Sequence, residues 1–434
     1  MSDGLVVTLV LLVLGALIAL RAPIFVALGF SGMLGLYLLQ GLTGLEQIPI
    51  SLVGQLQDFA LVAAPMYILM GEILSVSGLG QDLFKAAHRW LGRMPGSLGA
   101  SAIGASTVFG AMSGVSISSV AVVGRTSVPE MLERGYKPSF ASGSVVASGA
   151  LAMLIPPSLM FILYSSVTGV SIAALFAGGI VPGLILSVMM IAYVVIAAKV
   201  RPELAPAPAE TFTWAMRIRA LVRVIPALVL ILLVLGSMYT GLATPTEAAA
   251  VGALGAMVVV GVFYRALSWA NLRKALMSTT QVSGAVLAIV GSAYIFTQML
   301  VVARIPERIT AFVAGLDVPA YIVMLGVMAI MVLLGCLVDA GSLLLVVTPI
   351  LVPAMSALGF DPLWLGVLIV VNLEMAVITP PVGLNLYTMK SVVPELDLSD
   401  IFRGIVPYIV IEAALLAVMI AVPGIATWLP SVIA

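Results

Sequence analysis

The fold is decided by two stretches, Leu154-Ile155-Pro156-Pro157-Ser158 and Ile378-Thr379-Pro380-Pro381-Val382-Gly383, each of which places two consecutive prolines inside a long apolar segment. Two prolines remove two backbone donors and clash with the preceding helical turn, so each segment is predicted to be a broken helix. If such a segment lies in a membrane, the carbonyl groups freed at the break must be paired with protein, water or an ion.

The two stretches belong to a repeat with an offset of 224 residues. Between 128–157 and 352–381, nine of thirty residues are identical, and five of those nine are Pro or Gly. Chance matches in an apolar sequence would favour Val and Ala rather than residues with special backbone conformations. The chain is therefore predicted to contain two related halves.

The composition places the chain in a lipid bilayer. Of its 434 residues 62% are apolar and 9% are charged, and the mean hydropathy is +1.23. Soluble domains carry about 25% charged residues, so a water-soluble protein is excluded. At about 20 residues per spanning helix, the length accommodates ten or more passes.

Charge and rare residues exclude several other classes. The net charge is zero and there is no basic tract, so nucleic-acid binding is not expected. A single cysteine, Cys336, excludes an internal disulfide. A single histidine, His88, leaves a histidine-rich metal site or a histidine-based catalytic triad incomplete. The first apolar stretch follows Asp3 rather than basic residues, so it is interpreted as a retained helix and not a signal peptide.

Twelve apolar stretches can be distinguished. They lie at about 5–20, 23–40, 62–83, 98–124, 140–164, 173–198, 225–242, 245–264, 279–303, 320–351, 364–388 and 404–428. Two of them, 98–124 and 320–351, contain small polar residues at mid-segment, where a chain turns more readily than it continues as a helix. We interpret these two as re-entrant hairpins and the other ten as passes.

The positions of lysine and arginine support this topology. With two hairpins and an outward N-terminus, 17 of the 19 basic residues lie in inner loops, and only Arg304 and Arg308 lie outside. Cytoplasmic loops carry an excess of Lys and Arg, so the bias predicts the orientation. Both termini are predicted to lie in the periplasm.

Each half then has five passes and one hairpin, so the second copy is inverted relative to the first. Inverted repeats with interrupted helices are typical of secondary transporters with a site at mid-membrane. We predict a first repeat at 1–198, an inner basic linker at 199–223 and a second repeat at 224–434. The alternative is an unrelated polytopic protein with proline kinks.

Small oxygen-bearing residues gather near the hairpin turns and the double prolines. Carbonyls and hydroxyls there could form the uncharged oxygen cage that Na⁺ needs, and half-helix ends favour ions of either sign. The residues assigned to ion binding are Ser113, Gly114, Ser116, Asp339, Gly341, Ser342, Thr379 and Gly383. The residues assigned to substrate binding are Ser148, Pro156, Pro157, Ser158, Asn372, Pro380 and Pro381. The alternative is that these groups only satisfy helix breaks or pack the hairpin turns.

Carboxylates inside apolar stretches are functional candidates, because burying them is costly. They are Glu72, Asp339, Glu374 and Glu412. Asp339, at the second hairpin turn, is the strongest candidate for contact with an ion or a gate. Glu247 is interpreted as part of a helix capping box with Thr244 or Thr246 as the cap. No Lys or Arg is predicted deep in a pass, so the charge of a substrate is expected to be met by amide dipoles, ions or water.

His88 stands in the segment Lys85-Ala86-Ala87-His88-Arg89-Trp90-Leu91, which combines basic and aromatic residues. This pattern predicts a helix that lies on the inner leaflet. A catalytic role for His88 is not expected.

Several motifs resemble those of one transporter family. They are Gly110-Ala111-Met112-Ser113-Gly114-Val115-Ser116, Glu133-Arg134-Gly135-Tyr136, Ile155-Pro156-Pro157-Ser158 with Tyr164, the run from Ser171 to Gly183, Ala243-Thr244-Pro245-Thr246-Glu247-Ala248, and Asn372-Leu373-Glu374 leading into Thr379-Pro380-Pro381-Val382-Gly383. In this order, and nearly end to end, the chain resembles the large membrane (M) subunit of the tripartite ATP-independent periplasmic (TRAP) transporters. At the first hairpin turn Val115 stands where the family pattern has a serine, which weakens a side-chain role at that position and leaves ligation by its backbone open.

The resemblance implies a multi-pass subunit of a bacterial inner-membrane symporter with an elevator mechanism. It implies uptake of organic acids, such as C4-dicarboxylates or sugar acids, driven by sodium as the coupling ion, with no other cofactor and no transition metal. It also implies two partners, a periplasmic substrate-binding protein (P type) and a small four-helix membrane subunit (Q type). The two repeats use the length of this chain, so the small subunit is expected to be a separate polypeptide.

Three other readings remain. A stand-alone Na⁺/carboxylate symporter of the same superfamily would share the repeats and hairpins but need no binding protein. A channel would need a continuous hydrated pore, whereas inverted repeats serve alternating access. A membrane-embedded enzyme would need a nucleophile–base pair or a metal set, and no such spacing is found, so the chain is not expected to be an enzyme. The sequence does not name the acid.

Overall fold

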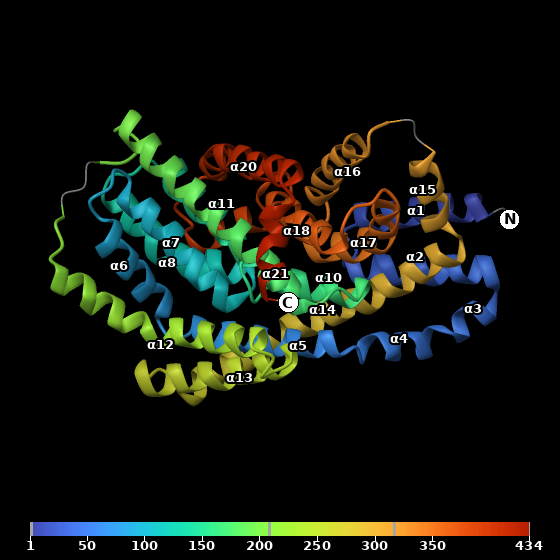
Figure 1. Cartoon of the computed structure of the whole chain (residues 1–434), viewed down its shortest axis with the longest axis horizontal. Coiled ribbons are helices and arrows are strands. Elements are labelled where there is room, and N and C mark those ends of the chain that lie inside the picture. The colour runs from blue at the N-terminus through green and yellow to red at the C-terminus, as the bar shows by residue number, and fades with distance from the viewer. Residues whose placement is uncertain (1–2, 207–209, 316–317, 434) are drawn as a thin grey trace.

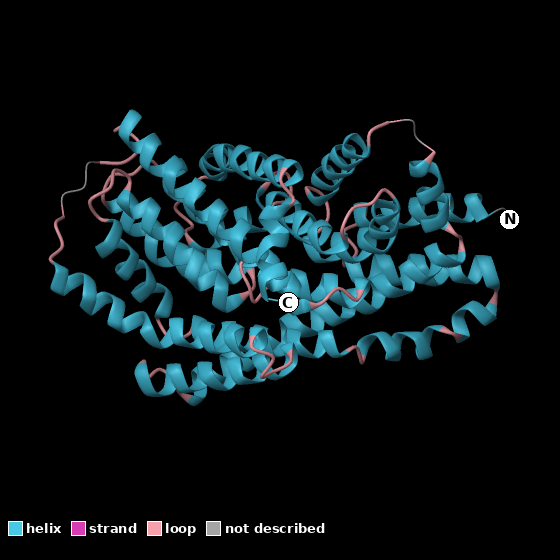
Figure 2. Cartoon of the chain, in the orientation of Figure 1, coloured by secondary structure: helices cyan, strands magenta, loops and turns pink. Residues whose placement is uncertain are grey.

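The computed structural model describes residues 3–206, 210–315 and 318–433. In these residues the chain is a bundle of helices joined by short loops, and none of them forms a strand (Figure 2). The prediction of an all-α fold is confirmed.

The helices, in chain order, are α1 (Asp3–Ala19), α2 (Ile24–Gln40), α3 (Leu42–Glu46), α4 (Ile48–Leu56), α5 (Phe59–Ser75), α6 (Leu79–Leu91), α7 (Ser97–Ser113), α8 (Ser116–Glu133), α9 (Pro138–Ala150), the 3-10 turn η1 (Leu151–Met153), α10 (Leu159–Thr168), α11 (Ile172–Val200), α12 (Trp214–Tyr239), α13 (Pro245–Val258), the π-helical turn η2 (Val259–Phe263), α14 (Trp269–Val302), α15 (Ile305–Ala314), α16 (Ala320–Gly335), α17 (Ala340–Ala357), α18 (Pro362–Ile378), α19 (Leu384–Val392), α20 (Leu398–Ala421) and α21 (Gly424–Ile433).

Six of the described helices are long and apolar enough to cross a membrane: α11, α12, α13 with η2, α14, α17 and α20. A seventh span is possible if the segments Leu42–Leu56 and Phe59–Ser75, which meet at a bend of 57°, count as one. Further apolar helices have 10 to 17 residues, among them α1, α2, α16 and α18, and are shorter than the 18 residues required of a span here. The chain is therefore a multi-pass membrane protein, and the number of ten passes stays a prediction.

Helix–turn–helix pairs lie at both predicted hairpins. The first consists of α7 and α8, which contact each other and turn at Gly114-Val115. The second consists of α16 and α17, with the turn at 336–339. Both reach beyond the predicted ends at 124 and 351, because α8 continues to Glu133 and α17 to Ala357. The charged residue that suggested an early end, Arg125, is exposed on the surface of α8, where a helix carries it without interruption.

The order of elements repeats with the offset found in the sequence. α8 and α17 begin 224 residues apart, and so do α9 and α18, each of which has proline as its first residue. The two prolyl bonds Pro156-Pro157 and Pro380-Pro381, both cis, also lie 224 residues apart. The boundaries of the two repeats and their inverted orientation stay predictions.

The bundle has an outer group of helices and a more buried one. α3, α4, α5, α12 and α13 follow one long edge of the molecule, and the long helix α14 packs on α2, α5 and α17 (Figure 1). The buried group includes α9, which packs against α20 at Gly143 and Gly404. A Cβ atom at Gly143 would lie 2.2 Å from the Gly404 carbonyl oxygen, so only glycine allows this approach.

The non-helical part of the predicted linker, 199–223, is shorter than expected. α11 extends to Val200 and α12 already begins at Trp214, and of its prolines Pro202 and Pro206 are described while Pro208 lies outside the described residues. Thr213 caps α12 by accepting a hydrogen bond from the Met216 backbone N–H at 3.4 Å.

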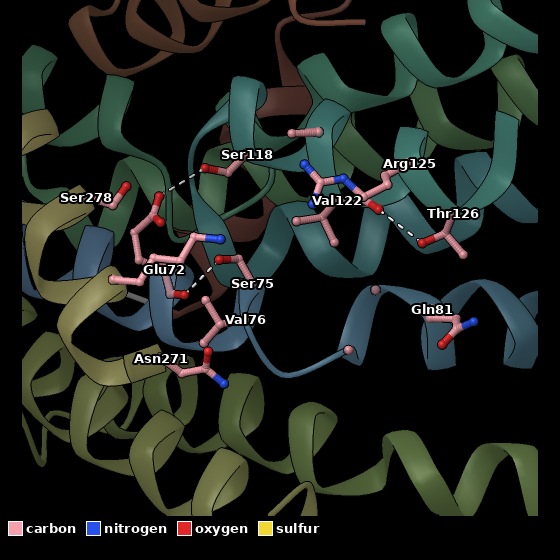
Figure 3. A pocket seen from close by; sticks show the side chains of 14 residues that line it. Glu72, Ser75, Val76, Gln81, Ser118, Val122, Arg125, Thr126, Asn271 and Ser278 are labelled. Carbon is pink, nitrogen blue, oxygen red and sulfur yellow. Dashed lines mark hydrogen bonds between the residues drawn. The ribbon is translucent and has the colours of Figure 1, made fainter. Parts of the chain in front are cut away.

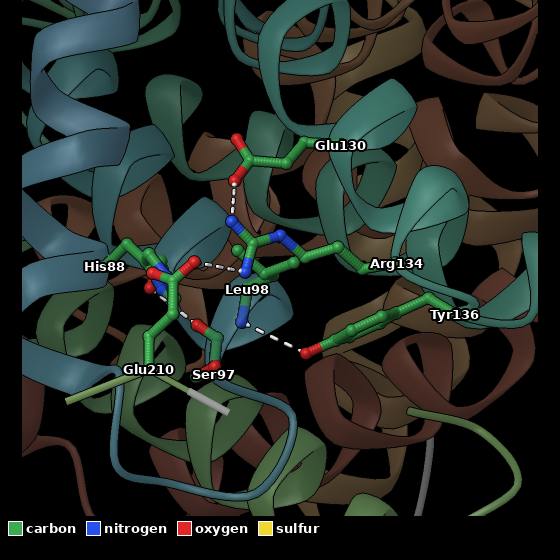
Figure 4. Close-up of polar contacts among 8 residues, drawn as sticks. His88, Ser97, Leu98, Glu130, Arg134, Tyr136 and Glu210 are labelled. Carbon is green, nitrogen blue, oxygen red and sulfur yellow. Dashed lines mark hydrogen bonds and ion pairs between the residues drawn. The ribbon is translucent and has the colours of Figure 1, made fainter. Parts of the chain in front are cut away.

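The end of this linker is anchored on α6 and α8 (Figure 4). Arg134 donates from Nη1 to Glu210 at 2.7 Å and from Nη2 to Glu130 at 2.9 Å. The His88 ring lies between Phe84 and Phe212, with Nε2 3.4 Å from Glu210. Burial lowers the pKa of His88, and the hydrogen bond from Arg134 lowers the pKa of Glu210. His88 is therefore a buried contact of the linker, on a helix whose leaflet position stays a prediction.

Candidate functional site

The two hairpin turns meet across a pocket of about 180 Å³. Gly114, Val115 and Ser116 of the first turn face Asp339, Ala340 and Gly341 of the second. The remaining lining is apolar and comes from α10, α14, α17 and the ends of the broken helices, with Met160, Leu163, Val282 and Val286 among its members. We call this pocket the central pocket. It brings together four residues assigned to ion binding from the sequence: Gly114, Ser116, Asp339 and Gly341.

The first turn is docked on its own double proline. Gly114 has a φ of +62°, and a Cβ atom there would lie 2.6 Å from the Pro157 carbonyl oxygen. Its own carbonyl oxygen accepts a hydrogen bond from the Leu159 N–H at 3.4 Å. The close approach therefore requires glycine, and it pairs one of the backbone groups that the helix break leaves open.

The second turn is docked on the other double proline in a similar way. The Val382 N–H donates to the Cys336 carbonyl oxygen at 3.2 Å. Here a side chain completes the turn: Asp339 accepts from the Ser342 N–H at 2.9 Å and from the Ser342 hydroxyl at 2.6 Å. Asp339 is therefore the N-cap of α17. Gly383, with a φ of +42°, precedes α19.

The other candidate oxygens differ in whether they already have a partner. The Ser113 hydroxyl is buried and has no hydrogen-bond partner among the described residues. The Thr379 hydroxyl donates to the Met375 carbonyl at 2.5 Å, and the Ser158 hydroxyl donates to the Met153 carbonyl. In the described part of the chain no three Asp, Glu, His or Cys side chains form a group that could hold a metal ion. A cation at this site would have to use carbonyl and hydroxyl oxygens, with Asp339 as the one carboxylate in the central pocket lining.

Several residues assigned to substrate binding lie away from the central pocket. Ser148, Ser158 and Asn372 are fully buried and are not among its lining residues. The Asn372 side-chain amide donates to the Met328 carbonyl at 2.8 Å, and the Ser148 hydroxyl donates to Val145 at 3.3 Å. The prolines Pro156, Pro157, Pro380 and Pro381 form the backbone breaks behind the two turns. The role of these residues in substrate binding stays a prediction.

A second, larger pocket of about 690 Å³ lies between α5, α6, α8 and α14 (Figure 3). We call it the polar pocket. Its wall carries Arg125, Lys274 and Glu72 together with Ser118 and other serine, threonine and amide side chains. The Ser118 hydroxyl donates to Glu72 Oε1 at 3.3 Å, which links α8 to α5.

The cations of the polar pocket were not predicted from the sequence. The first hairpin was expected to end at 124 and the span of α14 to begin at 279, which left Arg125 and Lys274 in loops. A local signal for α14 was available: Ser268 caps the helix by accepting from the Asn271 N–H at 3.2 Å, so the helix begins at Trp269 and includes Lys274.

The remaining carboxylates have different environments. The capping box at Glu247 is confirmed, with Thr244 as the cap: Glu247 accepts from the Thr244 N–H at 2.8 Å. Glu374 and Glu412 are 0% and 1% exposed, and their oxygens have no hydrogen-bond partner among the described residues. They stay functional candidates without an assigned role.

Comparison with known proteins gives a consistent result. The family described as "Tripartite ATP-independent periplasmic transporter, DctM component" matches residues 11–425. The chain is 31% identical over 405 residues to the C4-dicarboxylate TRAP transporter large permease protein DctM of Pseudomonas aeruginosa, covering 93% of this chain and 94% of that protein. It is 31% identical over 400 residues to the isethionate TRAP transporter permease protein DctMQ of Oleidesulfovibrio alaskensis, covering 90% of this chain and 62% of that protein.

Among solved structures, the YdaH transporter of Alcanivorax borkumensis has a similar fold. The TM-score is 0.64 at 17% sequence identity, and the alignment covers 89% of this chain and 90% of that one. At this identity the likeness concerns the fold alone.

Proposed function

The chain belongs to the DctM component family of the TRAP transporters, and we propose that it is the large permease of a sodium-coupled, binding-protein-dependent importer of organic acids. The observation that carries the proposal is the central pocket, where two hairpin turns, each docked on a double proline, face each other. Interrupted helices that meet in this way are the usual architecture of a substrate and ion site in secondary transporters.

The substrate class is proposed from the relatives. The P. aeruginosa relative is named for C4-dicarboxylates, and another relative, from Vibrio cholerae, is named for sialic acid. C4-dicarboxylates and sialic acid are both organic anions, and we propose that the substrate of this chain is an organic acid of the same kind. Sodium would bind to the oxygens around the two turns, where Ser113 and Asp339 offer a hydroxyl and a carboxylate.

The mechanism we propose is an elevator. The two hairpins and the two broken helices would move as one body, because each turn is bonded to its own break and α10 of the first half packs on α17 of the second. Helices α5, α13 and α14 would form the frame against which this body moves. In this arrangement α14 contributes Val282 and Val286 to the apolar wall of the central pocket.

Two partners are part of the proposal. The name of the relative DctMQ combines the letter M of the large permease with the letter Q of the small one, and that protein is longer than this chain. This supports a small Q-type subunit as the partner here. A periplasmic binding protein of the P type would deliver the substrate. The complex would lie in the bacterial inner membrane.

Reconstitution tests the function. Proteoliposomes that contain the chain, the small subunit and the binding protein are given a panel of labelled organic acids. We expect uptake of at least one acid, and its loss when choline replaces sodium at constant pH. Undiminished uptake driven by a proton gradient alone would refute sodium coupling. Uptake by the chain alone, without a binding protein, would instead favour the stand-alone symporter.

Cysteine labelling tests the orientation. Single cysteines are placed at Ser2, which lies outside the described residues, and at Ile433, in a Cys336→Ser background. A membrane-impermeant thiol reagent is expected to label both sites in intact spheroplasts, because both termini are predicted to be periplasmic. Protection of either site would contradict the proposed topology.

A further inference from the structure

The polar pocket and the central pocket are distinct, but residues of α8 line both of them. Ser116 lines the central pocket, and Ser118, two residues further along α8, lines the polar pocket. The polar pocket then follows one face of α8, formed by Ser118, Val122 and Arg125 (Figure 3). Spacings of four and three residues place these side chains above one another on a helix.

One face of α14 also lines the pocket, beside residues of α5 and α6. Asn271, Lys274 and Ser278 of α14 lie at spacings of three and four residues and all line the pocket. The polar pocket is therefore a groove between a helix of the proposed moving body, α8, and a helix of the proposed frame, α14.

The charges in this groove are unbalanced. Arg125 and Lys274 line it, and within the described ranges neither forms an ion pair. The one carboxylate in the lining, Glu72, accepts a hydrogen bond from Ser118, and its charge leaves the lining with a net charge of +1.

We propose that the polar pocket is an anion-selective vestibule, in which Arg125 and Lys274 attract the carboxylates of the organic acid as it leaves the central pocket toward the inner side. Guanidinium groups pair with carboxylates in a bidentate geometry, and a cleft lined by one sign of charge raises the local concentration of the opposite ion. Glu72 lowers the net positive charge of the groove and so limits how tightly an anion is held, since a conducting site must not hold its ion tightly.

The inference rests on the proposed function for the identity of the anion, but its charge selectivity can be measured without transport. In inside-out vesicles, a cysteine is placed at Ser278 in the Cys336→Ser background. Its reaction rates with a negatively charged and a positively charged methanethiosulfonate are measured, and each is divided by the rate of the same reagent with free cysteine. We expect the anionic reagent to be favoured in this ratio.

Removal of one cation should lower this preference. Arg125→Gln and Lys274→Gln are each expected to lower it roughly threefold to tenfold, the effect of one charge at a distance of several ångströms in a hydrated groove. Arg125→Lys, which keeps the positive charge, should show the same preference for the anionic reagent as the parent protein. Arg273→Gln removes a neighbouring charge that does not line the pocket and should leave it unchanged. The neutral methyl methanethiosulfonate should react with all variants at similar rates, which checks that the groove is intact.

Two results would overturn the proposal. One is a parent protein in which both charged reagents react equally well or the cationic one is favoured. The other is a preference that survives both Arg125→Gln and Lys274→Gln. If the reconstituted complex transports no organic acid, the proposed function fails while the reagent ratio can still be measured. Transport without any anion preference refutes the vestibule alone.

Discussion

Each half of the molecule docks a hairpin turn on a double proline through a backbone hydrogen bond, but the two turns are built differently. In the first half the contact is made by backbone: Gly114 has a positive φ and lies directly against Pro157. In the second half Asp339 holds the turn through two hydrogen bonds to Ser342, and the glycine beside it, Gly341, meets only ordinary contacts of 3.4 Å or more.

The difference extends to the oxygens that could bind an ion. The Ser113 hydroxyl at the first turn has no partner among the described residues, whereas the hydroxyls of Ser342 and Thr379 in the second half are both used within the protein. The first half thus depends on backbone shape and leaves side-chain oxygen free. The second half depends on a carboxylate, which would have to serve as helix cap and ion ligand together.

The largest effect is expected from Gly114→Ala. The positive φ costs about 1–2 kcal/mol for a residue with a Cβ atom, and overlap with the Pro157 carbonyl adds about 1–3 kcal/mol. We expect a lower melting temperature in detergent and loss of most uptake. The matched variant Gly341→Ala lies in the first turn of α17, where alanine favours the helix, and should keep the stability of the parent protein. Equal effects of the two variants would remove the distinction between the turns.

Two variants of Asp339 distinguish helix capping from ion binding in the second half. Asp339→Ala is expected to cost about 0.5–2 kcal/mol in the free energy of unfolding, because the cap of α17 is lost. Asp339→Asn keeps a good cap but removes the charge. If Asp339 also binds sodium, both variants should need more sodium for half-maximal uptake, while only the alanine variant is less stable. Normal sodium dependence in Asp339→Asn would leave Asp339 with a capping role alone.

Two variants that each lack one hydroxyl test the same difference between the halves, and their expected effects are smaller. Thr379→Val removes the hydrogen bond to Met375 and is expected to cost about 0.5–1.5 kcal/mol. Ser113→Ala removes a buried hydroxyl that has no partner in the described structure, so it should not lower stability. We expect both to raise the sodium concentration for half-maximal uptake, as measured in proteoliposomes. A Ser113→Ala variant with normal sodium dependence would exclude this hydroxyl from the ion site.

The parts of the fold that were predicted from the sequence are those encoded by local chemistry. Consecutive prolines must break a helix, and Thr244 with Glu247 must cap one, so both features could be identified from a few neighbouring residues. The ends of α8 and α14 could not, because Arg125 and Lys274 were taken as signs of a loop, whereas an exposed helix face carries such charges at little cost. Segment α3–α4 was missed for a similar reason, since Gln47, Pro49 and Gln55 interrupt its apolar pattern.

The candidate site was predicted in its composition but not in its contacts. The backbone hydrogen bonds from Leu159 to Gly114 and from Val382 to Cys336 join residues 45 or 46 positions apart, and backbone groups leave no mark in the side-chain pattern. The two turns and the two breaks could therefore be predicted from the sequence only as separate features. Only the structure shows which residues border the central pocket and which, like Asn372, are enclosed in the core.

The smallest effect is expected where the halves differ in the helix that precedes each hairpin, α6 in the first half and α15 in the second. In the first half α6 is held to the linker by the buried His88 and by Glu210 with Arg134. The helix that precedes the hairpin of the second half, α15, packs on α17, and its one ion pair within the described residues is the exposed pair of Arg308 and Asp3 at 3.3 Å. Burial lowers the pKa of His88 below its usual 6.5, and Arg134 lowers the pKa of Glu210 below 4.5.

Both shifts have the same sign for stability. Because each folded pKa is lowered, the unfolded chain takes up the proton first, and stability is lost as the pH falls. The loss from His88 begins near pH 6.5 and the loss from Glu210 only near pH 4.5. Unfolding measured between pH 7.5 and about 5 should thus show a decline that His88→Gln removes and Glu210→Gln does not. At constant neutral pH Glu210→Gln should cost only about 0.2–1 kcal/mol, since the pair with Arg134 is partly exposed. If the stability of His88→Gln still declines as the pH falls, groups other than His88 cause the decline. The contact between His88 and the linker would then not contribute to the pH dependence of stability.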